Sequence, residues 1–157
     1  MTRLWRLSAA EYARAFDGGY GVANSGRWNG RGHPVTYCAT VPSLCVLEKL
    51  VHVEDPSLLP DGLIMVEYDV PDRVGTDIVD LDDLPAGWQH DEDLTQTRGD
   101  EWLESVVGPL LQVPSVIVAM PGALDRNVVI NHRHSAASRI RIVNEYPFEL
   151  DPRLVRI

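Results

Sequence analysis

A glycine-rich run, GRWNGRG at residues 26–32, places two arginines where they could bind a phosphate group. Glycines let the backbone approach a ligand closely, and the guanidinium groups of Arg27 and Arg31 can form bidentate contacts with phosphate oxygens. Glycine–arginine loops are also common as ordinary structural turns. The run therefore predicts either a loop that binds an anionic ligand through Arg27 or a surface turn.

Glu48 is a second candidate, because its sequence neighbours would place a carboxylate on an apolar helix face. If residues 42–53 form a helix, Leu44 and His52 lie one turn away on either side of Glu48. A buried carboxylate costs on the order of several kcal/mol unless it is paired, so one interpretation is a structural ion pair with Arg27 or Lys49. The other is a carboxylate that stabilises the positive charge developing when a glycosidic bond breaks.

The third candidate group is a set of polar residues next to apolar segments. Ser115 begins the run SVIVAM, and Asn127 and Asn131 bracket the apolar residues 128–130. Hydroxyl and amide side chains at strand ends are often turn formers. No histidine stands beside Ser115 to activate it as a nucleophile, so we expect Ser115 to orient another group rather than to attack.

The hydrophobic pattern predicts short strands and helices that would position these residues. We expect strands at residues 2–7, 35–39, 63–70, 115–120, 127–130 and 139–150. We expect helices at residues 9–16, where Ser8 and Glu11 would form a capping box, at 42–53, and from 99 to a break near Gly108 and Pro109. Residues 17–34 hold six glycines and predict a long loop, which in a compact domain is often functional.

The irregular order of these elements predicts an α+β fold, with a mixed sheet core and flanking helices. A chain of 157 residues suits one domain over residues 1–157. The composition is 45% hydrophobic and 24% charged, which excludes disordered and collagen-like classes. Neither a GxGxxG nor a Walker-type loop is present, so the two common nucleotide-binding folds are excluded.

The net charge of −9 argues against a protein that binds nucleic acid through phosphate contacts. Between Glu54 and Glu104 there are sixteen acidic residues and only two arginines. This stretch is typical of a solvated surface; an acidic face for a basic partner is the alternative.

No apolar run approaches the roughly 20 residues of a membrane span, and the N-terminal residues lack the apolar region of a secretory signal. We therefore expect a cytoplasmic protein. Cys38 and Cys45 are too few for a thiolate metal site and lie in apolar stretches, which indicates small core residues. His132 and His134 have no evident third ligand, so no metal site is expected.

Taken together and in order, four segments resemble the RES domain, which is named for its Arg, Glu and Ser. They are GRWNGRGHPVTY, PSLCVLEKLVH, VPSVIV and NVVIN, and the resemblance covers about residues 3–143. It implies an ADP-ribosyltransferase-like fold and a toxin that depletes NAD⁺ by hydrolysis or phosphorolysis of the nicotinamide–ribose bond. Phosphate would then be a possible co-substrate. At least one branch of the family modifies a protein with ADP-ribose instead.

By position, Arg27, Tyr37, Glu48 and Ser115 match the family's Arg, Tyr, Glu and Ser. The resemblance implies that Arg27 grips the pyrophosphate, that Tyr37 stacks on nicotinamide or ribose, and that Glu48 stabilises the ribosyl cation. Ser115 and Asn127 would complete the NAD⁺ site.

The resemblance also implies an antitoxin partner with an Xre-type helix-turn-helix, and it allows a homodimer within that complex. A mono-ADP-ribosyltransferase acting on a protein or metabolite is the alternative within the same chemistry. A non-enzymatic binding module, with Glu48 in a structural ion pair, is the alternative from another class. A ribonuclease toxin is disfavoured by the acidic charge.

Overall fold

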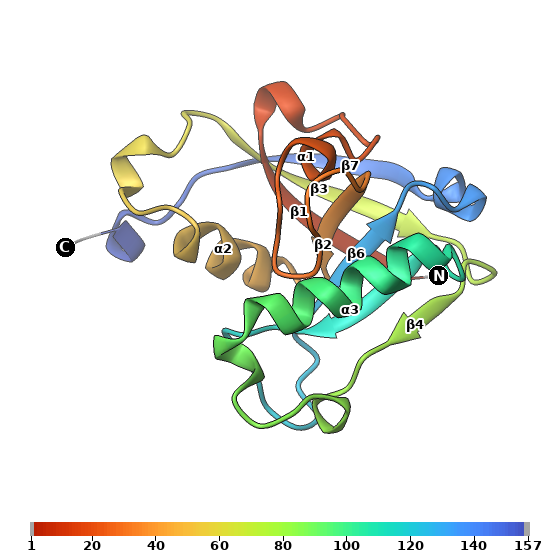
Figure 1. Ribbon diagram of the computed structural model, residues 1–157. Coiled ribbons are helices and arrows are strands. Elements are labelled where there is room, and N and C mark those ends of the chain that lie inside the picture. The colour runs from red at the N-terminus through yellow and green to blue at the C-terminus, as the bar shows by residue number, and fades with distance from the viewer. Residues whose placement is uncertain (1, 156–157) are drawn as a thin grey trace.

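Strands from both ends and the middle of the chain assemble into one mixed sheet (Figure 1). The computed structural model describes residues 2–155, so residues 1 and 156–157 of the expected domain lie outside the described part. The strand order is β4-β5-β6-β2-β1-β3-β7, and every neighbouring pair is antiparallel except β4 and β5. The strands are β1 (Thr2–Ala9), β2 (Val35–Ala39), β3 (Leu63–Val70), β4 (Thr76–Ile78), β5 (Leu110–Pro114), β6 (Arg126–Asn131) and β7 (Arg141–Phe148).

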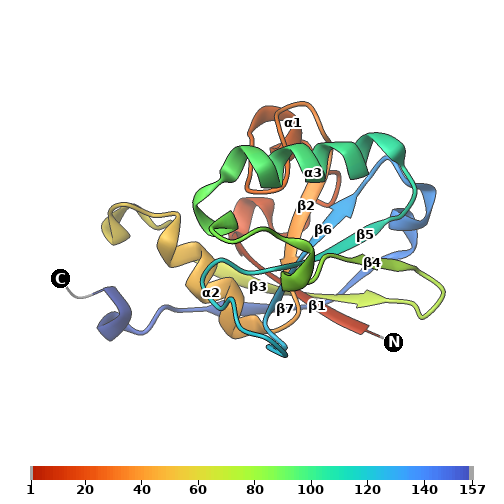
Figure 2. The ribbon, with the colours of Figure 1, turned by 60° about the horizontal axis from the view of Figure 1, so that its bottom comes forward.

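Three α-helices connect and cover these strands. They are α1 (Gly19–Ala23), α2 (Pro42–Val51) and α3 (Glu92–Ser105), and the described residues also form six short 3₁₀ turns, the last of which follows β7. Figure 2 shows α3 as a separate layer above the strands. The expected α+β class with a mixed sheet and flanking helices is confirmed.

The two longer helices pack on the same face of the sheet. Leu44 and Cys45 of α2 pack with Leu7 of β1 and Ala39 of β2, while Leu103 of α3 packs with Val113 and Val129, among others. Ala39 pairs with Asn127 of β6, which pairs with Val113 of β5, so these residues share one face. The opposite face packs against connecting segments through residues such as Cys38, Tyr68 and Ile130.

Two expected helices differ from the observed ones. The helix expected at residues 9–16 is only a 3₁₀ turn, Ala10–Tyr12, because β1 continues to Ala9 and pairs along its length with β3. Ser8 pairs with Ile64 in this ladder, and its hydroxyl bonds the carbonyl of Ala9 instead of capping a helix. Helix α3 starts at Glu92 rather than at residue 99, because Asp91 caps it by accepting the backbone N–H of Leu94.

The strand expected at residues 115–120 is also wrong. Strand β5 runs instead from Leu110 to Pro114, so Ser115 follows the strand rather than opening it. The reason is pairing: β6 begins at Arg126, opposite Pro114, and no strand continues beside residues 115–120. The long loop expected at 17–34 contains the short helix α1.

The strands expected at 2–7, 35–39, 63–70, 127–130 and 139–150 are confirmed; the bounds of the second and third match the observed ones, and the ends of the others differ by one or two residues. The helix expected at 42–53 is confirmed as Pro42–Val51, with Pro42 in its first turn. Within residues 2–155, no helix has the length and apolar character needed to cross a membrane.

Candidate functional site

Three of the five predicted site residues meet at one carboxylate oxygen. Glu48 Oε1 accepts a hydrogen bond of 3.0 Å from the hydroxyl of Ser115 and one of 2.7 Å from Nδ2 of Asn127. The hydroxyl oxygen of Ser115 in turn accepts the backbone N–H of Ile117, so the serine itself is held in place. Ser115 is fully buried, whereas the Glu48 side chain is 25% exposed. The carboxylate is therefore oriented by buried polar groups but reachable from solvent.

The local sequence explains how Glu48 reaches this position. Leu44 and Cys45 bury one side of α2 against the sheet, and Glu48 lies one turn beyond Leu44. Asn127 pairs with Ala39, the last residue of β2, and α2 begins three residues after Ala39. Side chains alternate along a strand, so Tyr37 lies on the same face as Ala39 and Asn127.

The negative charge of Glu48 has no ion pair with Arg27 or Lys49. Of the two interpretations of Glu48, the structural ion pair with Arg27 or Lys49 is therefore not observed; the hydrogen bonds of Glu48 come from the neutral groups of Ser115 and Asn127. The second oxygen, Oε2, lies 3.7 Å from Nε2 of His52, whose side chain is 76% exposed. A carboxylate that is held in place by neutral groups can stabilise a positive charge that develops beside it during a reaction.

Tyr37 connects this face of the sheet to the glycine-rich loop. Its hydroxyl donates to Oδ1 of Asn29 at 2.6 Å and accepts the backbone N–H of Trp28 at 3.0 Å. Burial raises the pKa of Tyr37 well above its ordinary value of 10.0, so the phenol remains protonated at neutral pH. Gly26 suits this close packing, because a Cβ at this position would lie 2.6 Å from Oδ1 of Asn29 and 2.8 Å from the Tyr37 hydroxyl and would displace this hydrogen-bonded pair. Through these two hydrogen bonds, Tyr37 holds the loop that carries Arg27.

Arg27 is half-buried, and its guanidinium donates a 2.7 Å hydrogen bond to the carbonyl of Gln89. The structure therefore brings Glu48, Ser115 and Asn127 into direct contact and places Tyr37 on the same sheet face. Arg27 is linked to them only through the loop that Tyr37 holds. Arg31, on the same loop, is exposed.

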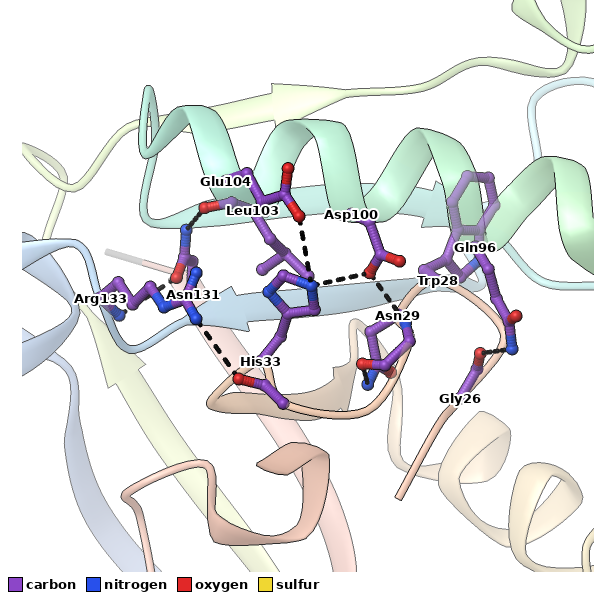
Figure 3. A network of polar contacts seen from close by, with 12 residues as sticks. Gly26, Trp28, Asn29, His33, Gln96, Asp100, Leu103, Glu104, Asn131 and Arg133 are labelled. Atoms are coloured by element: carbon purple, nitrogen blue, oxygen red, sulfur yellow. Dashed lines mark hydrogen bonds and ion pairs between the residues drawn. The ribbon is translucent and has the colours of Figure 1, made fainter. Parts of the chain in front are cut away.

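Helix α3 contributes residues that no pattern in the sequence had indicated. Asp100 accepts the backbone N–H of Gly30 at 2.8 Å and lies 3.2 Å from Nε2 of His33 (Figure 3). Gln96 donates to the carbonyl of Gly26 at 2.9 Å. The sequence marked residues 26–34 as a loop, but nothing in it indicated that α3 would bind that loop.

The other candidate residues serve the fold. Cys38 and Cys45 are buried free thiols, as expected, and burial raises the pKa of Cys45 to about 12. His132 Nε2 lies 2.8 Å from the hydroxyl of Thr36, and Nδ1 of His134 accepts the backbone N–H of Ala136. Among residues 2–155, no group of three or more His, Cys, Asp or Glu side chains is arranged to hold a metal ion.

The chain matches a known family model and named relatives over almost its whole length. Residues 3–151 match the model of the RES domain. A Pseudomonas putida protein named Toxin Res is 40% identical over 152 residues, covering 96% of this chain and 98% of that protein. A Sphingobium protein named Prs ADP-ribosylating toxin is 32% identical over 164 residues, covering 99% and 98%.

A solved structure shares the fold. The crystal structure of the M. tuberculosis MbcT–MbcA toxin–antitoxin complex contains a chain that superposes with a TM-score of 0.67 at 16% sequence identity. The match covers 98% of this chain and 86% of that one.

Proposed function

Because the chain belongs to the RES-domain family, we propose that it is the toxin of a toxin–antitoxin pair and cleaves the nicotinamide–ribose bond of NAD⁺. Water or phosphate would accept the ADP-ribosyl group. The observation that carries this proposal is the Glu48 carboxylate. Ser115 and Asn127 hold one of its oxygens, and the other lies 3.7 Å from Nε2 of the exposed His52.

The chemistry needs such a group. When the bond between ribose C1′ and the nicotinamide nitrogen breaks, its electron pair neutralises the pyridinium ring, and positive charge builds on the ribose. Glu48 Oε2 stabilises that charge or accepts a ribose hydroxyl proton in a hydrogen bond. An oxygen of water or phosphate then forms the new bond to C1′ and releases its proton to solvent.

The remaining site residues bind and orient the dinucleotide. Arg27 contacts the pyrophosphate, since a guanidinium matches paired phosphate oxygens. Tyr37 offers a ring face near the ribose or nicotinamide, and its raised pKa keeps it a neutral phenol. Ser115 and Asn127 act through Glu48. No metal ion has a part in this scheme.

Incubation of the purified protein with NAD⁺ alone tests the proposal. We expect free nicotinamide with ADP-ribose as the second product, or ADP-ribose-1″-phosphate when phosphate is supplied. Expression in cells without a partner should arrest growth and lower NAD⁺. Growth arrest with an unchanged NAD⁺ pool would overturn the proposal, and equal arrest by Glu48→Gln would favour a non-enzymatic binding module.

A second candidate is transfer of ADP-ribose to a protein or metabolite, which the name of the Sphingobium relative favours. The same residues would serve, because bond cleavage at C1′ is common to both reactions. Nicotinamide release that requires an added cell extract, with label from adenine-labelled NAD⁺ appearing on a macromolecule, would support transfer. Release from NAD⁺ alone supports the hydrolase or phosphorylase.

A partner must restrain such an enzyme in its own cell, and the toxin–antitoxin complex with the shared fold supports an antitoxin. We expect a helix-turn-helix protein of the Xre type that covers the NAD⁺ site. Its blocking segment should carry acidic or polar groups that meet Arg27 and Arg31, the groups otherwise available to phosphate. Co-purification and loss of NAD⁺ binding in the complex would test this; NAD⁺ binding that persists in the complex would refute occlusion. A toxin homodimer within the complex is part of the same expectation.

A further inference from the structure

Residues 26–33, the part of the glycine-rich loop that carries Arg27, contain a bridge between Gly26 and Asn29 but no helix or longer strand, and they lie along α3 (Figure 3). The contact is close. Gly99 of α3 faces the backbone of Trp28 so directly that a Cβ there would lie 1.7 Å from the Trp28 carbonyl oxygen. Gln96, one turn earlier, bonds the carbonyl of Gly26. Helix α3 thus contacts the loop backbone on both sides of Arg27, through its own backbone at Trp28 and through the Gln96 side chain at Gly26.

Asp100 is the charged residue of α3 that binds the backbone of this loop, and it shares the side chain of His33 with Glu104, whose Oε1 lies 3.9 Å from Nε2. One oxygen, Oδ1, accepts the backbone N–H of Gly30 at 2.8 Å and lies 3.2 Å from Nε2 of the buried His33. A backbone N–H bound to a carboxylate is a charge-assisted hydrogen bond, which is stronger than a neutral one. The single oxygen therefore joins both ends of residues 30–33 to the helix.

The loop depends on such bonds for its shape. Gly26 and Asn29 close the turn around Arg27 with two backbone hydrogen bonds of their own. The backbone groups beside this turn need partners from outside it, and the Tyr37 hydroxyl binds Trp28 while α3 binds Gly30. The guanidinium of Arg27 is bound on the same side, to the carbonyl of Gln89 in the turn just before α3. Loosening the bond between Asp100 and Gly30 therefore lets this closed turn shift as a unit relative to α3, and Arg27 shifts with it.

We infer that Asp100 is a positioning residue that acts through Arg27 on the pyrophosphate part of the substrate. The inference rests on the proposed function. Asp100 itself need not touch the substrate, and its negative charge would by itself repel an anionic ligand. Removing it should nevertheless weaken binding of that ligand, which is the opposite of the direct electrostatic effect.

A double-mutant cycle with ADP-ribose as the probe tests this. Asp100→Ala should raise the dissociation constant for ADP-ribose and the KM for NAD⁺ by about ten- to hundredfold, the range for a hydrogen bond to a charged group. The kcat should stay close to that of the unchanged protein. In an Arg27→Ala background, Asp100→Ala should add little, because coupled residues are not additive.

Two further variants separate positioning from charge and from folding. Glu101→Gln removes a negative charge from the neighbouring, exposed position of α3, and it should leave binding unchanged or slightly stronger. Asp100→Asn keeps an oxygen that can accept the Gly30 N–H and should lose less affinity than the alanine variant; it carries the test if Asp100→Ala fails to fold. Equal losses from Asp100→Ala with and without Arg27 would overturn the inference. Failure of the unchanged protein to release nicotinamide would overturn the proposed function instead.

Discussion

Asn127 donates a 2.7 Å hydrogen bond to Glu48 across a sequence separation of 79 residues, and this bond joins strand β6 to helix α2. Ser115 donates to the same carboxylate oxygen. Both donors are neutral, so they fix the direction of the carboxylate without cancelling its charge. This arrangement makes the charge of Glu48 separable from its hydrogen bonds by substitution.

We expect Glu48→Gln to remove NAD⁺ cleavage while the fold persists. The glutamine Oε1 can still accept the bonds of Ser115 and Asn127, and a neutral amide is no harder to bury than a carboxylate. Loss of one preorganised electrostatic group lowers turnover by roughly 10²–10³-fold. Nicotinamide release and melting temperature, measured on the same preparation, test both parts.

Glu54→Gln is the matched control, because Glu54 is exposed just beyond α2. It should leave turnover and melting temperature unchanged. A folded Glu48→Gln protein with near-normal turnover would end the catalytic assignment, and a parallel loss of folding and activity would indicate a structural role.

Ser115→Ala should weaken catalysis without abolishing it. The substitution removes one of the two donors to Glu48 and leaves the N–H of Ile117 without its acceptor. A lost hydrogen bond to a charged group corresponds to roughly ten- to hundredfold in turnover, and loss of the bond to the Ile117 N–H costs about 0.5–1.5 kcal/mol in unfolding free energy. Kinetics and chemical denaturation measure the two effects. Complete loss of turnover in a folded protein would instead indicate that Ser115 attacks the substrate.

The sequence predicted the parts of this site that depend on local pattern. The strand at 35–39 and the helix that starts at Pro42 follow from alternation and from proline chemistry, and they place Tyr37 and Glu48 on the elements observed. Ser115 was expected to begin a strand at residues 115–120, but it follows strand β5. An apolar run such as SVIVAM does not reveal which residues pair with a neighbouring strand. Strand pairing is a tertiary property that the run itself does not contain.

The bond between α3 and the glycine-rich loop could not be predicted either. It depends on Gly99 and Asp100 meeting Trp28 and Gly30, about 70 residues earlier in the chain. In isolation, an aspartate in a helix is typical of a solvated surface, and a glycine there is a weak helix former. Only the packing of α3 on the sheet shows that both face the loop.

Acid should destabilise the protein through His132. Burial of the ring lowers the pKa of His132 below its ordinary value of 6.5, so the folded state binds its proton less readily than the unfolded chain does. The contribution to stability is present above pH 6.5 and is lost as the pH falls toward the folded pKa. For one proton, the slope of unfolding free energy against pH is at most about 1.4 kcal/mol per pH unit.

His132→Gln should flatten this slope below pH 6.5 in urea denaturation series. The substitution also replaces the contact with the Thr36 hydroxyl, so stability at pH 8 serves as the reference for each protein. The exposed His90→Gln should keep the slope of the unchanged protein. Identical slopes for His132→Gln and the unchanged protein would show that His132 does not account for the acid sensitivity.

Gly99→Ala should separate α3 from the loop that carries Arg27. The added Cβ would lie 1.7 Å from the Trp28 carbonyl oxygen, a backbone atom that cannot rotate away. Overpacking of this kind costs about 1–3 kcal/mol or more, and the displaced loop should also raise the KM for NAD⁺.

Gly75→Ala is the matched control, because its Cβ would meet nothing within 4 Å. Denaturation curves and NAD⁺ kinetics for the two variants measure the difference. A Gly99→Ala protein as stable and as active as Gly75→Ala would show that the loop does not depend on its close approach to α3.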